Sequence, residues 1–224
     1  MGWIAVNRSL TQSEMENNAD IIIAYYRSLN YSDYTIASIL GNMQAESSLS
    51  PVRTEMGGGG GYGLVQWTPK SKLINHCNIL GASPYTSGDI QLYVLDKEMG
   101  TSSVNEWYTT APFINNYTSS GATQDMIGIT PAQFKSNSMN FSVDKLTILF
   151  MVAYERPSTS PSTNHISTRK SFASNWYQYI TGQPPTPPTP PTPPTPPYPP
   201  VPRPISTLGR RGRKIIGYKH KYLH

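Results

Sequence analysis

Glu46 is the side chain whose position in the sequence best suits acid–base chemistry. It lies in the segment Gly41-Asn-Met-Gln-Ala-Glu-Ser-Ser-Leu-Ser-Pro51, where a helical pattern ends in polar, turn-forming residues. A run of glycines follows, and then the segment Gly61-Tyr-Gly-Leu-Val-Gln-Trp-Thr68, which predicts a short strand or hairpin. We expect the carboxyl at the helix C-terminus to face that strand across a cleft.

A carboxyl group in such a place could cleave a glycosidic bond, because the leaving oxygen must receive a proton near neutral pH. A free Glu side chain, with a pKa of about 4.3, is mostly ionised there. The partial negative charge of a helix C-terminus disfavours an anion, and so does partial burial in an aromatic cleft. We therefore assign Glu46 as the general acid. The pattern alone also allows a solvent-exposed glutamate at a helix end.

The predicted strand offers side chains for binding a sugar. Gln66 and Trp67 would line the floor of the cleft, since a sugar ring stacks on an indole and an amide bonds an N-acetyl group or hydroxyl. Core packing is the alternative role for Trp67. Glu55, just before the glycine run, is the best-placed second carboxylate, and an inverting enzyme needs one about 6.5–9.5 Å from the acid. Without such a base, the substrate's own hydroxyl or acetamido group would have to react.

Other chemistries find little support in the sequence. The four histidines show no His-x-x-x-His or Cys-x-x-Cys spacing, so we expect neither a metal nor another cofactor, and His76 is expected to be a packing or surface residue. Cys77 is the only cysteine, which excludes an intrachain disulfide, and we expect it to be a buried small apolar residue rather than a nucleophile.

Two helices should position Glu46. Thr11-Gln-Ser-Glu14 fits a capping box that opens a helix reaching about Leu29. Ser32-Asp33 can cap a second helix that ends near Glu46-Ser47, with Ile36, Ile39, Leu40 and Met43 as its apolar stripe. The glycine run 57–61 predicts a loop leading to a strand at 63–67. Further helices are expected at 70–80, 89–99, a short piece after Thr130-Pro131, 143–154 and 171–180.

Three segments together resemble a known family: Gly41-Asn-Met-Gln-Ala-Glu-Ser, then Gly63-Leu-Val-Gln-Trp-Thr-Pro69, then Ala153-Tyr-Glu-Arg-Pro157. Their order over about residues 9–180 is similar to the tail lysozymes of phi29-like bacteriophages, within the wider lysozyme and lytic-transglycosylase superfamily. The resemblance implies an α+β, mostly α fold, a lysozyme-like domain with a small β-hairpin that acts on peptidoglycan. It makes Glu46 the catalytic glutamate.

The resemblance also suggests roles for residues around Glu46. It implies that Tyr154 faces Glu46 and orients that side chain or the substrate. With Gln66 and Trp67, the substrate-binding candidates are Gln44, Tyr62 and Tyr154. Glu155 and Arg156 are expected to form a structural ion pair rather than to act in catalysis.

Composition divides the chain into three parts. Residues 1–182 form the predicted catalytic domain, residues 183–204 repeat Pro-Pro-Thr as a polyproline II linker, and residues 205–224 form a basic tail with interleaved aromatic residues. Seven of the 18 Lys and Arg residues lie from Arg203 onward, where there is no Asp or Glu, so the body is nearly neutral. The N-terminus lacks a secretory signal pattern, and no apolar run approaches the ~20 residues needed to span a bilayer.

These observations and the resemblance predict a virion-associated peptidoglycan glycosidase of the distal phage tail, made in the host cytoplasm, that opens the wall during genome entry. The basic tail 205–224 could dock onto other tail proteins, bind DNA or an anionic wall polymer, or form a disordered end. Relatives often carry a peptidase domain after the lysozyme, where this chain has the proline-rich stretch. A lytic transglycosylase or endolysin of the same fold is one alternative. A non-enzymatic tail-tip or glycan-binding protein is another.

Overall fold

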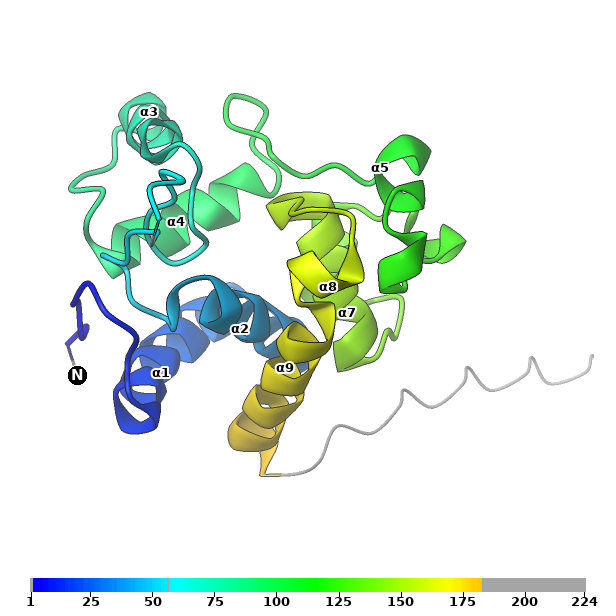
Figure 1. Cartoon of the computed structure of the whole chain (residues 1–224), viewed down its shortest axis with the longest axis horizontal. Coiled ribbons are helices and arrows are strands. Elements are labelled where there is room, and N and C mark those ends of the chain that lie inside the picture. The colour runs from blue at the N-terminus through cyan, green and yellow to red at the C-terminus, as the bar shows by residue number, and fades with distance from the viewer. Residues whose placement is uncertain (1, 56, 183–224) are drawn as a thin grey trace, which may run out of the picture. The chain divides into compact units, whose positions relative to one another are not determined.

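The computed structural model describes residues 2–55 and 57–182. Most of them are helical, as the sequence predicts, and they form one compact unit. The linker 183–204 and the tail 205–224 lie outside the described residues. The helical segments, shown in Figure 1, are α1 (Gln12–Ser28), α2 (Asp33–Ser47), α3 (Lys70–Leu80), α4 (Gly88–Glu98), α5 (Ala111–Asn115), η1 (Thr118–Ser120), η2 (Gln124–Met126), α6 (Pro131–Ser136), α7 (Val143–Phe150), η3 (Met151–Glu155), α8 (Pro161–Asn164) and α9 (Ile166–Thr181).

The first two helices begin where their capping residues predict. The Thr11 hydroxyl accepts a hydrogen bond from the backbone N–H of Glu14, and the Glu14 carboxylate accepts one from the N–H of Thr11, which completes the capping box of α1. Ser32 caps α2 by accepting from the N–H of Thr35. Helix α2 ends at Ser47, after which Ser48 adopts the left-handed conformation. Glu46 therefore lies in the last turn of α2.

Helix α2 is the central element of the domain. Its predicted apolar stripe is buried, and it packs against α9 and α7, with α1 along another side (Figure 1). Gly41 permits the close approach of α9, because a Cβ at this position would lie 2.6 Å from the Cβ of Ala173 and 2.7 Å from the backbone oxygen of Arg169. The absent side chain thus brings the N-terminal half of α9 alongside the C-terminal half of α2.

The segment after the glycine run differs from its prediction. The strand expected at 63–67 is wrong, because residues 63–66 form successive turns. Tyr62 makes isolated antiparallel bridges to Thr54 and Trp67, so the β-hairpin is reduced to single bridges. Gly63 has a φ of +80° and Gln66 a φ of +50°, values that a strand does not hold. The tight turn nevertheless presents Gln66 and Trp67 on one wall of a cleft.

The later helices follow the predicted order with shifted ends. Helices α3 and α4 lie where expected, and α6 begins after a second capping box, made by Thr130 and Gln133. The apolar helix predicted to end at Tyr154 changes character, since α7 continues into the π-helical turn η3. Helix α9 starts at Ile166, five residues before the expected start at 171, because its first turns also have a buried side. Within the described residues, no helix is long and apolar enough to cross a membrane.

Candidate active site

A cleft of about 630 Å³ opens beside the C-terminal end of α2. Its walls come from segments distant in sequence: the end of α2, the loop after it, the turn at 65–68, α3, and η3 with the residues that follow it. Glu46, Glu55 and Glu155 are the three carboxylates of the lining, and Arg53, Lys72 and Arg156 are its three cations. The cleft is therefore polar, with an indole wall at Trp67.

Glu46 forms an ion pair with Arg169 of α9. The Arg169 side chain is only 5% exposed and that of Glu46 is 20% exposed, so Glu46 borders the cleft while Arg169 is buried beside it. Two further hydrogen bonds hold the guanidinium: Nη1 donates to Oδ1 of Asn42 over 3.1 Å, and Nε donates to the backbone oxygen of Asn164 over 2.9 Å. The close approach at Gly41 makes this contact between α2 and α9 possible.

Arg169 is a contact of Glu46 that the sequence argument does not include. Sequence reasoning could not include this cation, because Arg169 is far from Glu46 along the chain and lies within an ordinary amphipathic helix. The structure thus adds a buried cation to the helix end and the aromatic cleft on which that argument rests.

Glu155 is the carboxyl of the cleft whose surroundings disfavour ionisation. Its Oε1 atom is buried and has no hydrogen-bond partner among the described residues. Burial raises the pKa of Glu155 well above its ordinary value, and the neighbouring Glu46 carboxylate raises this pKa further, against the opposing effects of Arg169 and Arg156. Glu46 and Glu155 thus border the same cleft, and Arg169 contacts Glu46.

The π-helical turn η3 positions Glu155. The N–H of Arg156 donates to the backbone oxygen of Met151 over 2.7 Å, and Arg156 then turns into the left-handed region at a φ of +52°. The wider turn accommodates one more residue than an α-helical turn, which rotates successive side chains relative to α7. Tyr154 is directed toward buried Glu98, while Glu155 borders the cleft.

Glu98 is fully buried behind the cleft and joins three side chains. Trp67 Nε1 donates to both carboxylate oxygens over 2.9 Å, His76 Nδ1 lies 2.5 Å from Oε1, and the Tyr154 hydroxyl donates to Oε2. Burial and the Glu98 carboxylate raise the pKa of Tyr154, so this hydroxyl keeps its proton. His76 is thus a polar contact of a buried carboxylate, a more defined role than the packing or surface position expected for it.

Two expected contacts of the third motif are absent from the described residues. Tyr154 lines the cleft, but its hydroxyl bonds Glu98 rather than Glu46, so the expected orientation of Glu46 by this hydroxyl is wrong in this structure. The predicted ion pair between Glu155 and Arg156 is also wrong. Arg156 instead pairs with Glu106 over 2.6 Å. The backbone turn at Arg156 separates the two neighbouring side chains.

The second motif contributes two side chains to the cleft. Trp67 lies in the lining, although only 3% exposed, so it both packs in the core and borders the cleft. Gln66 Nε2 donates to the backbone oxygens of Arg53 and Gly63, which fixes its amide. Glu55 also lies in the lining, and its Oε2 accepts from the N–H of Gly61 over 3.1 Å. That bond ties the second carboxylate to the end of the glycine loop.

Two of the substrate-binding candidates lie outside the cleft lining. Gln44 accepts a hydrogen bond from Trp176 Nε1 and borders a different groove. Tyr62 is buried, packs its ring edge-on against Tyr85, and lies under Lys70. Cys77 is buried and free, as expected. Within residues 2–55 and 57–182, no three His, Cys, Asp or Glu side chains are grouped to hold a metal ion.

Comparison with known proteins agrees with the order of the three motifs. The profile of a family described as phage tail lysozyme matches residues 17–180, most of the chain. The chain belongs to the phage tail lysozyme family. This confirms the resemblance found in the sequence, and the match spans the helices that build the cleft.

A curated relative supports the same assignment. The chain is 27% identical over 184 residues to Morphogenesis protein 1 of Bacillus phage B103, a phi29-like phage. The aligned region covers 80% of this chain but 44% of the relative, so the chain spans less than half of that protein's length. Together the two matches identify a phage tail-associated, lysozyme-like protein.

Proposed function

We propose that this protein is a virion-associated peptidoglycan glycosidase that cleaves the β-1,4 bond between N-acetylmuramic acid and N-acetylglucosamine. The placement of Glu46 and Glu155 in one cleft is the observation that carries the proposal. Burial raises the pKa of Glu155 well above its ordinary value, which favours a protonated carboxyl in the cleft. That proton is what a departing sugar oxygen requires.

In the proposed reaction Glu46 delivers the proton. It is the glutamate that matches the family motif, and its side chain is partly exposed in the cleft. Its carboxyl protonates the glycosidic oxygen as the bond to the anomeric carbon breaks, and Arg169 stabilises the carboxylate that results. Glu155 holds a proton in the cleft between turnovers. Water, or a group of the substrate itself, completes the reaction at the anomeric carbon.

The cations of the cleft suit a substrate that carries carboxylates. Lys72 and Arg156 both pair with Glu106, whereas the Arg53 guanidinium makes no hydrogen bond or ion pair within the described residues. Arg53 is thus available for the lactyl or peptide carboxylates of a muramic acid unit. Trp67 and the fixed amide of Gln66 would contact the sugar rings. A neutral chitin chain would leave Arg53 without a partner.

A lytic transglycosylase is the second candidate, and the environment of Glu55 favours it. Hydrolysis with inversion needs a firmly held base, yet Glu55 is bonded to a glycine loop through Gly61. If Glu55 does not position water, the 6-hydroxyl of the muramic acid would close on the anomeric carbon and leave a 1,6-anhydro end. Two further candidates are an endolysin that releases progeny and a tail-tip protein that binds glycan without turnover.

Mass spectrometry of fragments released from purified peptidoglycan separates these candidates. Wild-type protein should release muropeptides with reducing ends, and Glu46→Gln should release none, because loss of a general acid costs roughly 10²–10⁴ in rate. Arg27→Gln, which removes a surface ion pair far from the cleft lining, is the matched control and should act as wild type. Fragments with 1,6-anhydro ends would establish that the protein is a lytic transglycosylase. The absence of fragments from wild type would refute an enzymatic function.

We further propose that the protein resides in the distal phage tail and opens the host wall locally during genome entry. The family and the curated relative support a virion component. From their sequence, residues 205–224 would dock the enzyme onto other tail proteins, with nucleic acid or an anionic wall polymer as further possible ligands. Deleting them should leave cleavage of purified wall intact and remove the protein from particles. Unchanged incorporation would refute docking.

A further inference from the structure

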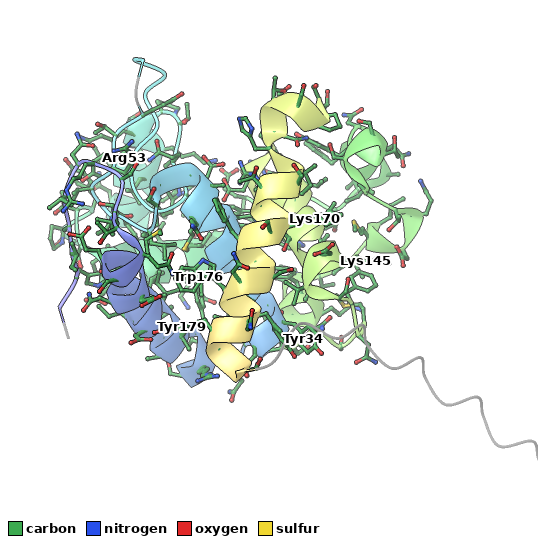
Figure 2. All side chains as sticks on the ribbon, turned by 60° about the horizontal axis from the view of Figure 1, so that its bottom comes forward. Tyr34, Arg53, Lys145, Lys170, Trp176 and Tyr179 are labelled. Carbon is green, nitrogen blue, oxygen red and sulfur yellow. The ribbon has the colours of Figure 1, made fainter. Side chains whose placement is uncertain are left out.

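A second groove, of about 460 Å³, lies between α9 and the neighbouring parts of α1 and α2. Phe172, Trp176 and Tyr179 of α9 form its aromatic part, and Figure 2 shows Trp176 and Tyr179 on the side of α9 that faces α1. Their rings meet edge to face, with centroids 5.5 Å apart. Amide side chains complete the lining: Gln12, Gln44, Asn175 and Gln178.

The groove is separate from the cleft. The two linings share no residue. Gln44 and Glu46 are two positions apart on α2, which places them roughly 200° apart around the helix axis. The groove and the cleft therefore lie on opposite sides of the last turns of α2.

The amides of the groove have unused hydrogen-bonding capacity. Gln44 Oε1 accepts from Trp176 Nε1, and this leaves the Gln44 Nε2 donor without a partner in the described residues. The side-chain amides of Asn175 and Gln178 make no hydrogen bond within the same part of the chain. Tyr179 is 44% exposed, a large fraction for an aromatic ring. An exposed ring beside unbonded amides matches the two needs of a sugar, a flat apolar face and hydrogen bonds to its hydroxyl or acetamido groups.

Charge narrows the class of ligand. The groove lining contains no Lys, Arg, Asp or Glu. Tyr179 and Gln12 of the lining donate to Asp20 and Glu16, so two negative charges contact the edge of the groove. These acids disfavour DNA and phosphate-bearing wall polymers. An uncharged sugar is therefore the ligand that fits this groove.

We propose that this groove is a second glycan-binding site, which holds N-acetylhexosamine units of a wall strand while the cleft cleaves elsewhere. The identity of the strand as peptidoglycan rests on the proposed function. Two linked contacts on one insoluble polymer strengthen retention far more than either contact strengthens binding of a short fragment. The groove therefore acts on polymeric wall and leaves the turnover of short soluble fragments unchanged.

The first test measures binding of N-acetylglucosamine tetramer to the full-length protein by NMR, with Glu46→Gln used to prevent turnover. The chain has four tryptophans, so the indole N–H signal of Trp176 can be assigned with Trp176→Phe. The tetramer should shift this signal saturably, whether or not the protein cleaves peptidoglycan. Binding that never moves the Trp176 signal would overturn the proposal. If wild type cleaves the wall but the tetramer does not shift this signal, the groove is not a glycan-binding site, whereas the proposed enzymatic function stands.

The second test measures retention on insoluble purified peptidoglycan at high salt, which screens the basic tail. Tyr179→Ala should weaken retention about tenfold, whereas Tyr179→Phe, which keeps the ring, should not. Ile79→Ala removes another exposed apolar side chain, on α3, and serves as the control. Equal retention of Tyr179→Ala and wild type would overturn the proposal. So would an equal loss of activity on short fragments, or binding that requires an anionic polymer.

Discussion

Two carboxyl groups near Tyr154, those of Glu98 and Glu155, have opposite surroundings. Glu98 is fully buried, yet its oxygens receive hydrogen bonds from Trp67 and Tyr154 and contact His76. Glu155 has a buried oxygen with no partner among the described residues. The charged group with the strongest effect on its pKa is another carboxylate, that of Glu46. The first arrangement connects the side chains around Glu98 by hydrogen bonds. In the second, burial and a neighbouring carboxylate raise the pKa of Glu155.

Glu98 is a structural group of the site, whereas Glu155 is a candidate for its chemistry. Satisfied donors around Glu98 fix Trp67 and Tyr154, which form the wall of the cleft. Glu155 Oε1 is a buried polar atom without a partner among the described residues, and a catalytic role is one explanation of such an atom.

Removal of Glu98 should have the largest effect. Glu98→Ala leaves buried donors of Trp67 and Tyr154 without an acceptor, so the free energy of unfolding should fall by about 3–5 kcal/mol. Urea unfolding followed by tryptophan fluorescence measures this loss. Asp33→Ala, which removes one partner of an exposed ion pair, should cost much less. Equal stability of the two variants would mean that Glu98 does not organise the wall of the cleft.

Tyr154→Phe tests which carboxyl the tyrosine serves. Loss of one charge-assisted hydrogen bond to Glu98 should cost about 1.5–3 kcal/mol in stability. The pH dependence of kcat on peptidoglycan should keep its shape, since the hydroxyl does not contact Glu46. Trp67→Phe removes a different donor to Glu98 and should cost a similar stability. A displaced pH profile with unchanged stability would show instead that Tyr154 acts on Glu46.

Gly41→Ala tests the contact that brings Arg169 to Glu46. The added methyl would lie 2.6 Å from the Cβ and backbone nitrogen of Ala173, so α9 must shift at a cost of about 1–3 kcal/mol. That shift should weaken the ion pair and lower activity at unchanged protein concentration. Calorimetry and wall-turbidity assays measure the two effects. Adding Ala173→Gly to Gly41→Ala should restore part of the lost stability and activity. If it restores neither, the contact between α2 and α9 is not the cause of the loss.

Glu155→Gln should have the smallest effect on stability, and its sign should depend on pH. The folded-state pKa of Glu155 lies above the unfolded value of about 4.3, so the unfolded state loses this proton first as pH rises. Wild type is therefore destabilised progressively above pH ~4, and the neutral amide is not. Unfolding at several pH values should show no difference at low pH and a more stable variant at neutral pH. A constant difference across the range would contradict the raised pKa.

Local patterns in the sequence predicted the parts of this molecule that they control. The capping residues Thr11 and Ser32 indicated the starts of α1 and α2, and the polar residues after Met43 indicated the end that carries Glu46. The strand at 63–67 was predicted wrongly because Gly63 and Gln66 adopt left-handed conformations that β-propensity does not reveal. Hydrophobic alternation resembles a strand even when turns hold the segment.

The electrostatics of the site could not be predicted, because its partners come from distant helices. Arg169 and Glu98 belong to segments whose patterns indicate only ordinary amphipathic helices. The π-helical turn that separates Glu155 from Arg156 has no signature in the sequence. Two adjacent charged residues therefore suggested an ion pair, whereas the backbone directs them to different surroundings.

The rate of peptidoglycan cleavage from pH 4 to 9, for wild type, Glu46→Gln and Glu155→Gln, tests the central claim most directly. The account with Glu46 as proton donor predicts that Glu46→Gln is inactive throughout. It also predicts that Glu155→Gln works at acidic pH and loses activity at neutral pH, because the variant lacks the carboxyl whose pKa is raised by burial. Activity of Glu46→Gln at any pH, together with complete loss in Glu155→Gln, would contradict the account and make Glu155 the proton donor.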